Sequence, residues 1–166
     1  MSDWEDIEAI KQVKARYFRY LDTKQFDKWR GIFTDDCTFD GLTRPYQSPD
    51  EFVAGCREWL GPAVTVHQGH TPEVVLTGPD TARGITAMYD WVEFEEPRTE
   101  GWAKGVRGFT GHGHYEEEYR REDGVWKIAF MRLTRLRLTA ITTPWQEELA
   151  SPHLSSIGRD WLEGVS

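Results

Sequence analysis

The stretch Ala63-Val64-Thr65-Val66-His67-Gln68-Gly69-His70 marks the point at which the chain changes from helical to strand periodicity. Before it, apolar residues recur every three or four positions, which is the spacing of an amphipathic helix. After it, apolar and polar residues alternate, which is the spacing of a half-buried strand. Helices gathered before the strands are typical of an α+β fold, in which the helices cover one side of an antiparallel sheet.

Three helices are predicted before this change. Two of them open with a capping box, in which a Ser side chain and a Glu three residues later satisfy the first backbone amides of the helix. The pairs are Ser2 with Glu5 and Ser48 with Glu51, and Pro49 suits the first position of the later helix. Apolar spacing places the helices at residues 3–21, 26–34 and 49–60, and Asp35-Asp36 ends the second.

The remainder of the chain reads as strands and a tail. Two short strands are followed by three long ones, at residues 63–67, 73–76, 81–96, 106–121 and 125–139. A strongly curved sheet closed by three helices would form a cone with a hollow inside. We expect one domain over residues 1–166, with 140–166 as a C-terminal tail or lid that carries Trp145, Leu149 and Ile157.

Composition excludes several classes of protein. The net charge is −8 and no basic cluster is present, so a nucleic-acid partner is not expected. The chain lacks both a long apolar run and a basic, apolar leader, and we therefore expect a cytoplasmic protein with no membrane partner. Cys37 and Cys56 do not have the spacing of a zinc site or a disulfide scaffold, and they read as small buried residues.

Aromatic residues are unusually frequent, with eight Trp, six Tyr and eight Phe. Such a composition suits a pocket lined by rings that accepts a flat or polycyclic apolar ligand. An aromatic core without a pocket explains the same composition.

Five ionisable residues suggest chemistry: Tyr17 and Asp22 on the first predicted helix, and His67, Asp90 and Arg135 on different strands. An imidazole in contact with a carboxylate is a general base that works near neutral pH. Each residue also has a simpler explanation. Asp22 suits a helix end, and Asp90, inside an apolar run, could form a structural ion pair with Arg135.

The segment from Gly111 to Glu118 holds two further histidines. His112 and His114 share one face of the predicted strand with glutamates, and we favour a solvated stripe over a metal site. Glu117 lies on the opposite face, where it would contact substrate or pair with an arginine.

These motifs together resemble the SnoaL-like branch of the NTF2-like superfamily over about residues 5 to 138. The resemblance is carried by Tyr17-Phe-Arg-Tyr-Leu-Asp22, Trp29-Arg-Gly-Ile-Phe33-Thr-Asp-Asp36, His67-Gln-Gly-His-Thr-Pro-Glu73, Asp80-Thr-Ala-Arg-Gly84, Tyr89-Asp90, Gly111-His-Gly-His-Tyr115 and Asp123-Gly-Val-Trp-Lys-Ile128. It implies an NTF2-like cone, a curved antiparallel sheet with three N-terminal helices that enclose a cavity.

Within this branch the pattern is similar to that of scytalone dehydratase and bile-acid 7α-dehydratase. The resemblance implies that His67 is the base, that Asp22 orients it, and that Tyr17, Asp90 and Arg135 complete the catalytic group. Arg132 is the alternative register for Arg135, and His70 is the rival of His67. Substrate contacts are expected from Tyr20, His70, Tyr115 and Glu117.

The implied activity is that of a lyase that needs no cofactor and no metal. It would dehydrate a cyclic, largely apolar hydroxylated substrate of steroid or polyketide type. Two alternatives remain: a polyketide cyclase or isomerase that uses the same base, and a ligand-binding NTF2-like domain without catalysis. Because broad apolar sheet faces in a short chain are often covered by a second subunit, we also expect a homo-oligomer, a trimer or a dimer.

Overall fold

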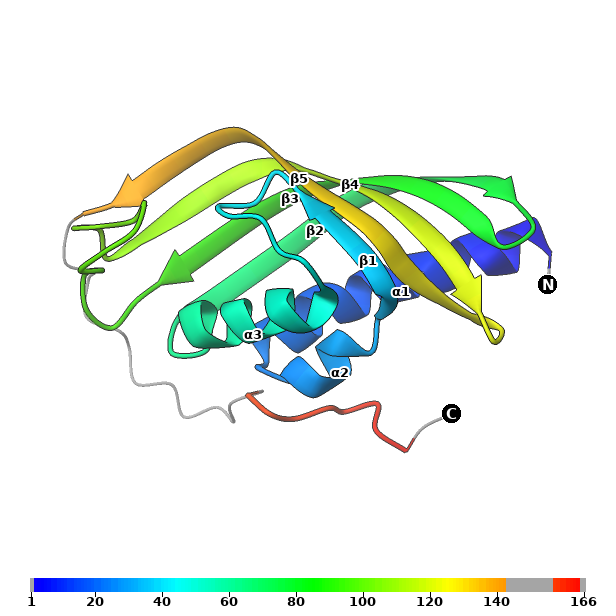
Figure 1. Cartoon of the computed structure of the whole chain (residues 1–166), viewed down its shortest axis with the longest axis horizontal. Coiled ribbons are helices and arrows are strands. Elements are labelled where there is room, and N and C mark those ends of the chain that lie inside the picture. The colour runs from blue at the N-terminus through cyan, green and yellow to red at the C-terminus, as the bar shows by residue number, and fades with distance from the viewer. Residues whose placement is uncertain (1, 143–156, 165–166) are drawn as a thin grey trace.

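A computed structural model describes residues 2–142 and 157–164 of the chain. The helices lie on one side of a single curved sheet, which arches over them (Figure 1). The α+β architecture expected from the sequence is confirmed. In chain order the elements are α1 (Asp3–Asp22), α2 (Phe26–Arg30), β1 (Phe33–Asp40), α3 (Pro49–Leu60), β2 (Val64–Gly78), β3 (Thr81–Glu93), β4 (Gly108–Glu122) and β5 (Val125–Ile141).

The two predicted capping motifs begin α1 and α3. Ser2 accepts a hydrogen bond from the backbone N–H of Glu5, and the Glu5 side chain accepts one from the backbone N–H of Ser2. In α3 the Ser48 hydroxyl accepts the N–H of Glu51 at 3.1 Å, and Pro49 occupies the first turn. These contacts satisfy amide donors that a helix leaves without internal partners, so both helices start where the sequence predicts.

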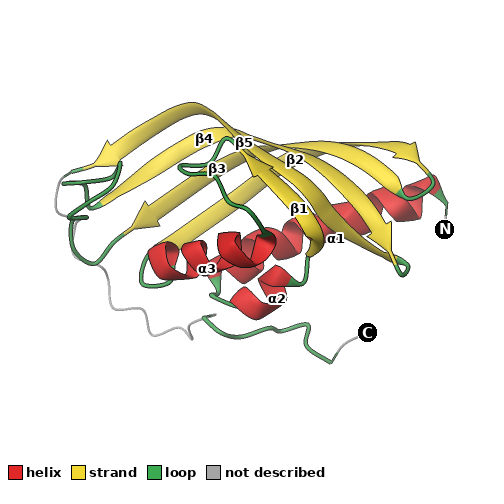
Figure 2. Ribbon diagram, in the orientation of Figure 1, coloured by secondary structure: helices red, strands yellow, loops and turns green. Residues whose placement is uncertain are grey.

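The sheet has five strands in the order β1-β5-β4-β3-β2. Strands β2 to β5 are antiparallel neighbours, whereas β1 runs parallel to β5 at one edge. Figure 2 shows the long strands curving around the helices. The curvature leaves room between the sheet and α1 and α3.

Strand β1 is an element that the sequence prediction missed. The pattern Phe26, Trp29, Ile32 and Phe33 predicted a helix that continues to Asp35-Asp36, but α2 ends at Arg30. From Phe33 the chain is extended and pairs with β5. Phe33 and Cys37 are then buried, at 1% and 2% exposure, so long-range packing outweighs the local helical spacing.

The two short strands predicted at residues 63–67 and 73–76 are one strand, β2. A register shift against β3 lies between His70 and Glu73, and Thr71 has a positive φ of 42°. A bulge of this kind bends a strand without ending it. The residues between the two predicted strands therefore form this bulge and not a turn.

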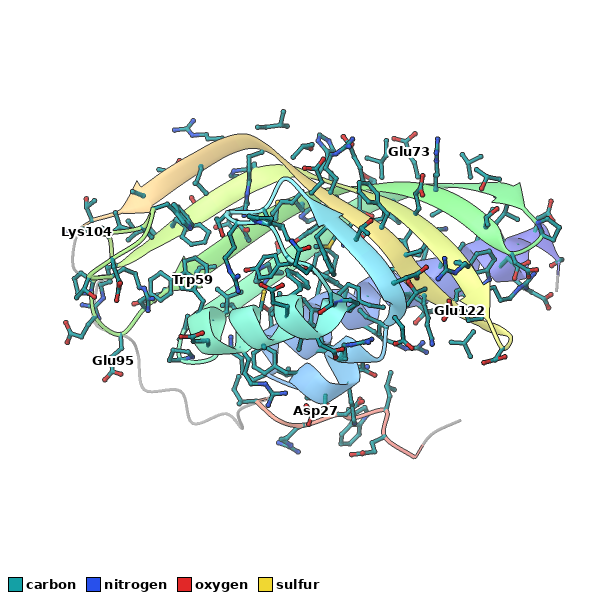
Figure 3. All side chains as sticks on the ribbon, viewed as in Figure 1. Asp27, Trp59, Glu73, Glu95, Lys104 and Glu122 are labelled. Atoms are coloured by element: carbon teal, nitrogen blue, oxygen red, sulfur yellow. The ribbon has the colours of Figure 1, made fainter. Side chains whose placement is uncertain are left out.

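The core lies between the helices and the concave face of the sheet. Trp29, Ile10, Ile128 and Met131 are completely buried there. Each large apolar side chain removed from water contributes about 1.5–3 kcal/mol to stability. Trp59 projects from α3 toward the sheet, whereas Glu73 lies on the opposite face of the sheet (Figure 3).

The described part of the C-terminal tail, residues 157–164, forms turns that lie against α1 and α2. The N–H of Gly158 donates to the Thr23 carbonyl at 2.6 Å. Asp160 forms ion pairs with Arg19 and with Lys28. Ile157 is exposed, and Trp145 and Leu149, which were expected to contribute to a lid, lie outside the described residues. Within the described ranges, none of the helices combines the length and apolarity needed to cross a membrane.

Candidate active site

A cavity of about 270 Å³ lies between the sheet and the helices. Its wall is mostly aromatic and aliphatic, and it also contains the imidazole of His67, the carboxylate of Asp90 and the guanidinium of Arg135, which reach it from the sheet. The aromatic side chains of the wall are Tyr17, Trp29, Tyr46, Phe52, Trp59, Trp102, Phe109 and Tyr115. Apolar walls with a few converging polar groups are the usual form of a small-molecule site.

Asp22 and His67 are in direct contact, although 45 positions separate them in the chain. The Asp22 Oδ1 atom lies 2.6 Å from His67 Nδ1, and Asp22 Oδ2 accepts the backbone N–H of His67 at 2.7 Å. Asp22 is the last residue of α1, and His67 faces it from β2. The His67 side chain is 5% exposed and that of Asp22 21%.

This contact determines which nitrogen of His67 carries a proton. A carboxylate can only accept hydrogen bonds, so the neutral ring places its hydrogen on Nδ1, toward Asp22. The other nitrogen, Nε2, then has a lone pair on the opposite edge of a ring that lines the cavity. An imidazole held in this way has the form required of a general base.

Asp90 and Arg135 form an ion pair in the same wall. Arg135 Nη2 lies 2.6 Å from Asp90 Oδ2, and the Asp90 side chain is 3% exposed. Asp90 is the direct neighbour of His67 in the β2–β3 ladder, so the two side chains leave the sheet on the same side. The second oxygen of Asp90, Oδ1, is buried without a hydrogen-bond partner among the described residues.

Tyr17 and Tyr115 lie side by side in the cavity wall. Their ring centroids are 5.4 Å apart, in an edge-to-face arrangement. Burial raises the pKa of Tyr17 well above its ordinary value, and the neighbouring Tyr115 adds to the effect. Both hydroxyls therefore stay protonated at neutral pH and can donate hydrogen bonds.

Three of the expected substrate contacts do not line the cavity. His70 is exposed on β2 beyond the cavity wall, and Tyr20 lies outside the wall with Arg19 over its ring. Glu117 is buried on the inner face of β4, as predicted, but its carboxylate is hydrogen-bonded to other residues and does not reach the cavity. The structure thus places His67, not His70, in contact with both Asp22 and the cavity.

The Glu117 carboxylate is part of a buried polar cluster. Lys14 Nζ donates to Glu117 Oε1 at 2.7 Å, and the Tyr119 hydroxyl donates to Glu117 Oε2 at 2.6 Å. The Lys14 ammonium also lies 3.5 Å from the centroid of the Tyr115 ring. Burial lowers the pKa of Lys14 to about 8, and the charge of Glu117 opposes that shift. Glu117 pairs with a lysine, not with the arginine considered from the sequence.

Two residues near Asp22 were missed from the sequence. Thr65 donates to Asp22 Oδ1 at 2.8 Å, and Lys24 donates to the Thr65 hydroxyl oxygen at 2.9 Å. Thr65 had a readable signal, because it precedes His67 by two positions on the same strand and shares its face. Lys24 had no such signal in the sequence, because the direction of its side chain depends on a positive backbone φ of 62°.

Neither a thiol nucleophile nor a metal cluster is apparent in this part of the molecule. Burial raises the pKa of Cys56 to about 12, so the one thiol in the cavity wall is protonated at neutral pH. Among residues 2–142 and 157–164, no three His, Cys, Asp or Glu side chains converge as ligands would. The side chains that reach the cavity are suited to proton transfer and to binding an oxygen atom.

Comparison with known proteins points to one family. The family model described as the SnoaL-like domain matches residues 2–132. A relative named "Probable cyclase FGR4", from Gibberella zeae, is 27% identical over 139 residues, which cover 76% of this chain and 89% of the relative.

Solved structures share the fold at low identity. A hexachlorocyclohexane dehydrochlorinase, LinA type 2, superposes with a TM-score of 0.72 at 19% identity and covers 91% of this chain and 97% of its own. A scytalone dehydratase-like protein from Novosphingobium aromaticivorans gives a TM-score of 0.71 at 18% identity, over 96% of this chain and 99% of its own.

Proposed function

The chain belongs to the SnoaL-like family, and from this premise we propose that it is a lyase that removes water from a small cyclic hydroxy-ketone with His67 as the base. The observation that carries the proposal is the 2.6 Å contact between His67 Nδ1 and Asp22 Oδ1 at the wall of an aromatic cavity. A pocket that only bound an apolar ligand would have no use for a buried imidazole backed by a carboxylate.

In the first step His67 Nε2 removes the proton from the carbon next to the substrate carbonyl. The electron pair of that C–H bond moves onto the carbonyl oxygen as an enolate. Arg135, which lines the cavity, stabilises the enolate oxygen through its charge. Asp22 stabilises the imidazolium that forms, in the way that a carboxylate supports the histidine of a catalytic triad.

In the second step the enolate re-forms the carbonyl and a carbon–carbon double bond, and the carbon–hydroxyl bond breaks. The His67 imidazolium returns its proton to the departing hydroxide, so water leaves and the base is restored. A tyrosine is ordinarily a weaker acid than an imidazolium, and burial raises the pKa of Tyr17 further, so its suitable role is to hold a substrate oxygen by a hydrogen bond. The buried Asp90 Oδ1 offers an acceptor for the substrate hydroxyl before it departs.

The size of the cavity limits the substrate. A cavity of about 150 Å³ accommodates one benzene ring, so the volume of about 270 Å³ suits about two rings. A four-ring steroid exceeds this volume and would have to extend out of the cavity. We therefore favour a bicyclic substrate of polyketide type over a steroid.

Cyclisation is the second candidate activity, because the relative from Gibberella zeae bears the name of a cyclase. It would use the same proton abstraction, but the enolate carbon would attack a second carbonyl of the substrate. The product would have the mass of the substrate, whereas dehydration lowers the mass by one water.

The test is a turnover assay with bicyclic β-hydroxy ketones whose dehydration yields a naphthol. Product is followed by absorbance, and mass spectrometry detects the loss of water. The wild-type chain is compared with His67→Gln, and His70→Gln serves as the matched control on the same strand. Removal of a general base lowers turnover by about 10²–10⁴-fold, so His67→Gln should be nearly inactive and His70→Gln unimpaired.

Each result has a defined meaning. Equal turnover in the wild type and His67→Gln would refute His67 as the base. A rearranged product of unchanged mass would favour the cyclase, and saturable binding without turnover would favour a ligand-binding domain. We further propose a cytoplasmic homo-oligomer without a cofactor. Apolar residues on the sheet, such as Val75 at 64% and Leu136 at 75% exposure, are where a second subunit would pack.

A further inference from the structure

We propose that Lys24 and Thr65 are positioning residues for the base: the Lys24 ammonium directs the Thr65 hydroxyl onto Asp22 and thereby fixes the carboxylate against His67. The inference rests on the proposed function, because it concerns the pair that would remove the proton. It adds two residues that do not touch the substrate.

A continuous row of hydrogen bonds connects the four side chains. Lys24 Nζ donates to Thr65 Oγ1 at 2.9 Å, and Thr65 Oγ1 donates to Asp22 Oδ1 at 2.8 Å. Asp22 Oδ1 is also the atom that faces His67 Nδ1 at 2.6 Å. The oxygen that orients the base is thus the one to which the Thr65 hydroxyl donates.

The direction of each hydrogen bond follows from the chemistry of the groups. A lysine ammonium can only donate, so the Thr65 oxygen must accept from Lys24. The single hydroxyl hydrogen of Thr65 is then available for Asp22, which can only accept. Without the ammonium, the Thr65 hydroxyl could rotate and donate elsewhere.

Local backbone geometry supports this role. Thr65 and His67 alternate with the exposed Val64 and Val66, so both point inward from β2 to the end of α1. Lys24 follows α1 with a φ of 62°, a left-handed conformation that is unfavourable for a residue with a side chain. Such a conformation persists only where surrounding contacts hold it, and here it accompanies the ammonium contact with Thr65.

The electrostatic setting of Lys24 is consistent with this arrangement. Partial burial lowers the pKa of Lys24 to about 8, and the nearby Asp22 carboxylate opposes the shift. At neutral pH the ammonium is therefore still mostly charged. Hydrogen bonds in which one partner is charged are shorter and stronger than neutral ones, which suits Lys24 to hold the hydroxyl in one orientation.

A purely structural role for Lys24 must be separated from this one. Its ammonium also donates to the carbonyl of Leu60, the last residue of α3, at 2.9 Å. A lysine that only capped this helix end would affect stability and not the base. Thr65→Val separates the two, because it removes the hydroxyl and leaves Lys24 able to bind Leu60.

The experiment measures the tautomer of His67 in the full-length chain, without any substrate. Imidazole ¹⁵N chemical shifts distinguish the form protonated on Nδ1 from the form protonated on Nε2. The variants are Lys24→Met, which removes the ammonium, Thr65→Val, which removes the hydroxyl, and Thr65→Ser, which restores it. Lys127→Met, at the hairpin between β4 and β5, is the control for loss of a lysine elsewhere.

We expect the Nδ1-protonated form in the wild type, Thr65→Ser and Lys127→Met. In Lys24→Met and Thr65→Val we expect a mixture of tautomers with a broadened Nδ1–H signal. With a turnover substrate in hand, the same two variants should lose about 10–100-fold in kcat with little change in KM, as is typical when a supporting hydrogen bond is removed.

The results separate this inference from the proposed function. If the wild type itself shows His67 protonated on Nε2, the Asp22–His67 pair is not formed and the proposed function fails. If the wild type shows the Nδ1 form and Thr65→Val leaves it unchanged, the base stands and the positioning role of Thr65 and Lys24 is refuted. Thermal unfolding of every variant shows whether a change in tautomer accompanies a loss of fold.

Discussion

Gly111 lies directly opposite Asp90 in the β3–β4 ladder, and the space that a side chain at position 111 would take is filled by the Asp90–Arg135 ion pair. A Cβ atom there would approach Arg135 Nη1 and Asp90 Oδ1 to less than 3.0 Å, closer than real Cβ contacts. The ion pair at the cavity wall therefore depends on a glycine in the neighbouring strand.

Gly111→Ala should displace the ion pair. Because one extra carbon in a packed site costs about 1–3 kcal/mol, we expect a loss of that order in the free energy of urea unfolding. Turnover should fall as well, since the Arg135 guanidinium would leave its place in the wall. A variant as stable and active as the wild type would show that the pair can move aside without consequence.

Asp22→Asn should abolish most of the activity without unfolding the chain. An amide can turn its N–H₂ group toward His67, which would favour the wrong tautomer. The equivalent change in a catalytic triad costs about 10⁴-fold in kcat, and we expect a loss of about 10²–10⁴-fold here. Circular dichroism and thermal unfolding report the fold. Wild-type turnover in Asp22→Asn would refute the role of Asp22 in catalysis.

The buried pair of Lys14 and Glu117 should make stability depend on pH above neutrality. Lys14 has a pKa of about 8 in the folded chain against an ordinary value of 10.5, so the unfolded chain binds the proton more tightly. Between pH 8 and 10.5 the unfolded state holds more protons, and stability conferred by this group rises with pH.

Urea unfolding at several pH values in this window tests the effect. The control is the double variant Lys14→Met/Glu117→Gln, which removes both charges. We expect the stability of the wild type relative to this variant to increase with pH, and a constant difference would refute the shift. The single variant Lys14→Met should be less stable than the wild type by about 3–5 kcal/mol, because it leaves the Glu117 carboxylate buried without a cation.

Asp160 should hold the described part of the tail against α1 and α2. Its hydrogen bond with Arg19 is the main reason that the pKa of Asp160 is lowered to about 2. A lowered carboxylate pKa confers stability that is complete above about pH 4 and is lost as the pH falls through about 2.

The Gly158 amide is a local probe of this attachment, because it donates to the Thr23 carbonyl. In Asp160→Asn the NMR signal of this amide should shift toward its position in an unfolded peptide even at neutral pH. In the wild type the same shift should occur only in acid. Identical Gly158 signals in the two proteins at neutral pH would assign the attachment to other contacts.

Much of the fold follows from local patterns. The capping boxes at Ser2 and Ser48 place the starts of α1 and α3 because a helix needs partners for its first amides. Alternating residues place β3 to β5 within a few positions. Strand β1 could not be found in this way, since Phe33 is helical by its spacing and becomes part of a strand only when β5 is available to pair with it.

The candidate site, too, is partly predictable from the sequence and partly dependent on the tertiary structure. The residue types in the sequence indicate an imidazole and a carboxylate suited to proton abstraction, together with an arginine suited to binding an oxygen atom. The motif around His67 indicates the family. Only the tertiary structure shows that His67, and not His70, contacts Asp22, and that Glu117 pairs with Lys14. Whether a side chain on a bent strand points inward or outward depends on the register of that strand. Which residue it contacts across the core depends on how distant segments pack together. Local sequence records neither, so the hydrogen bonds that link Lys24, Thr65 and Asp22 are seen only in the structure, in which α1 ends beside β2.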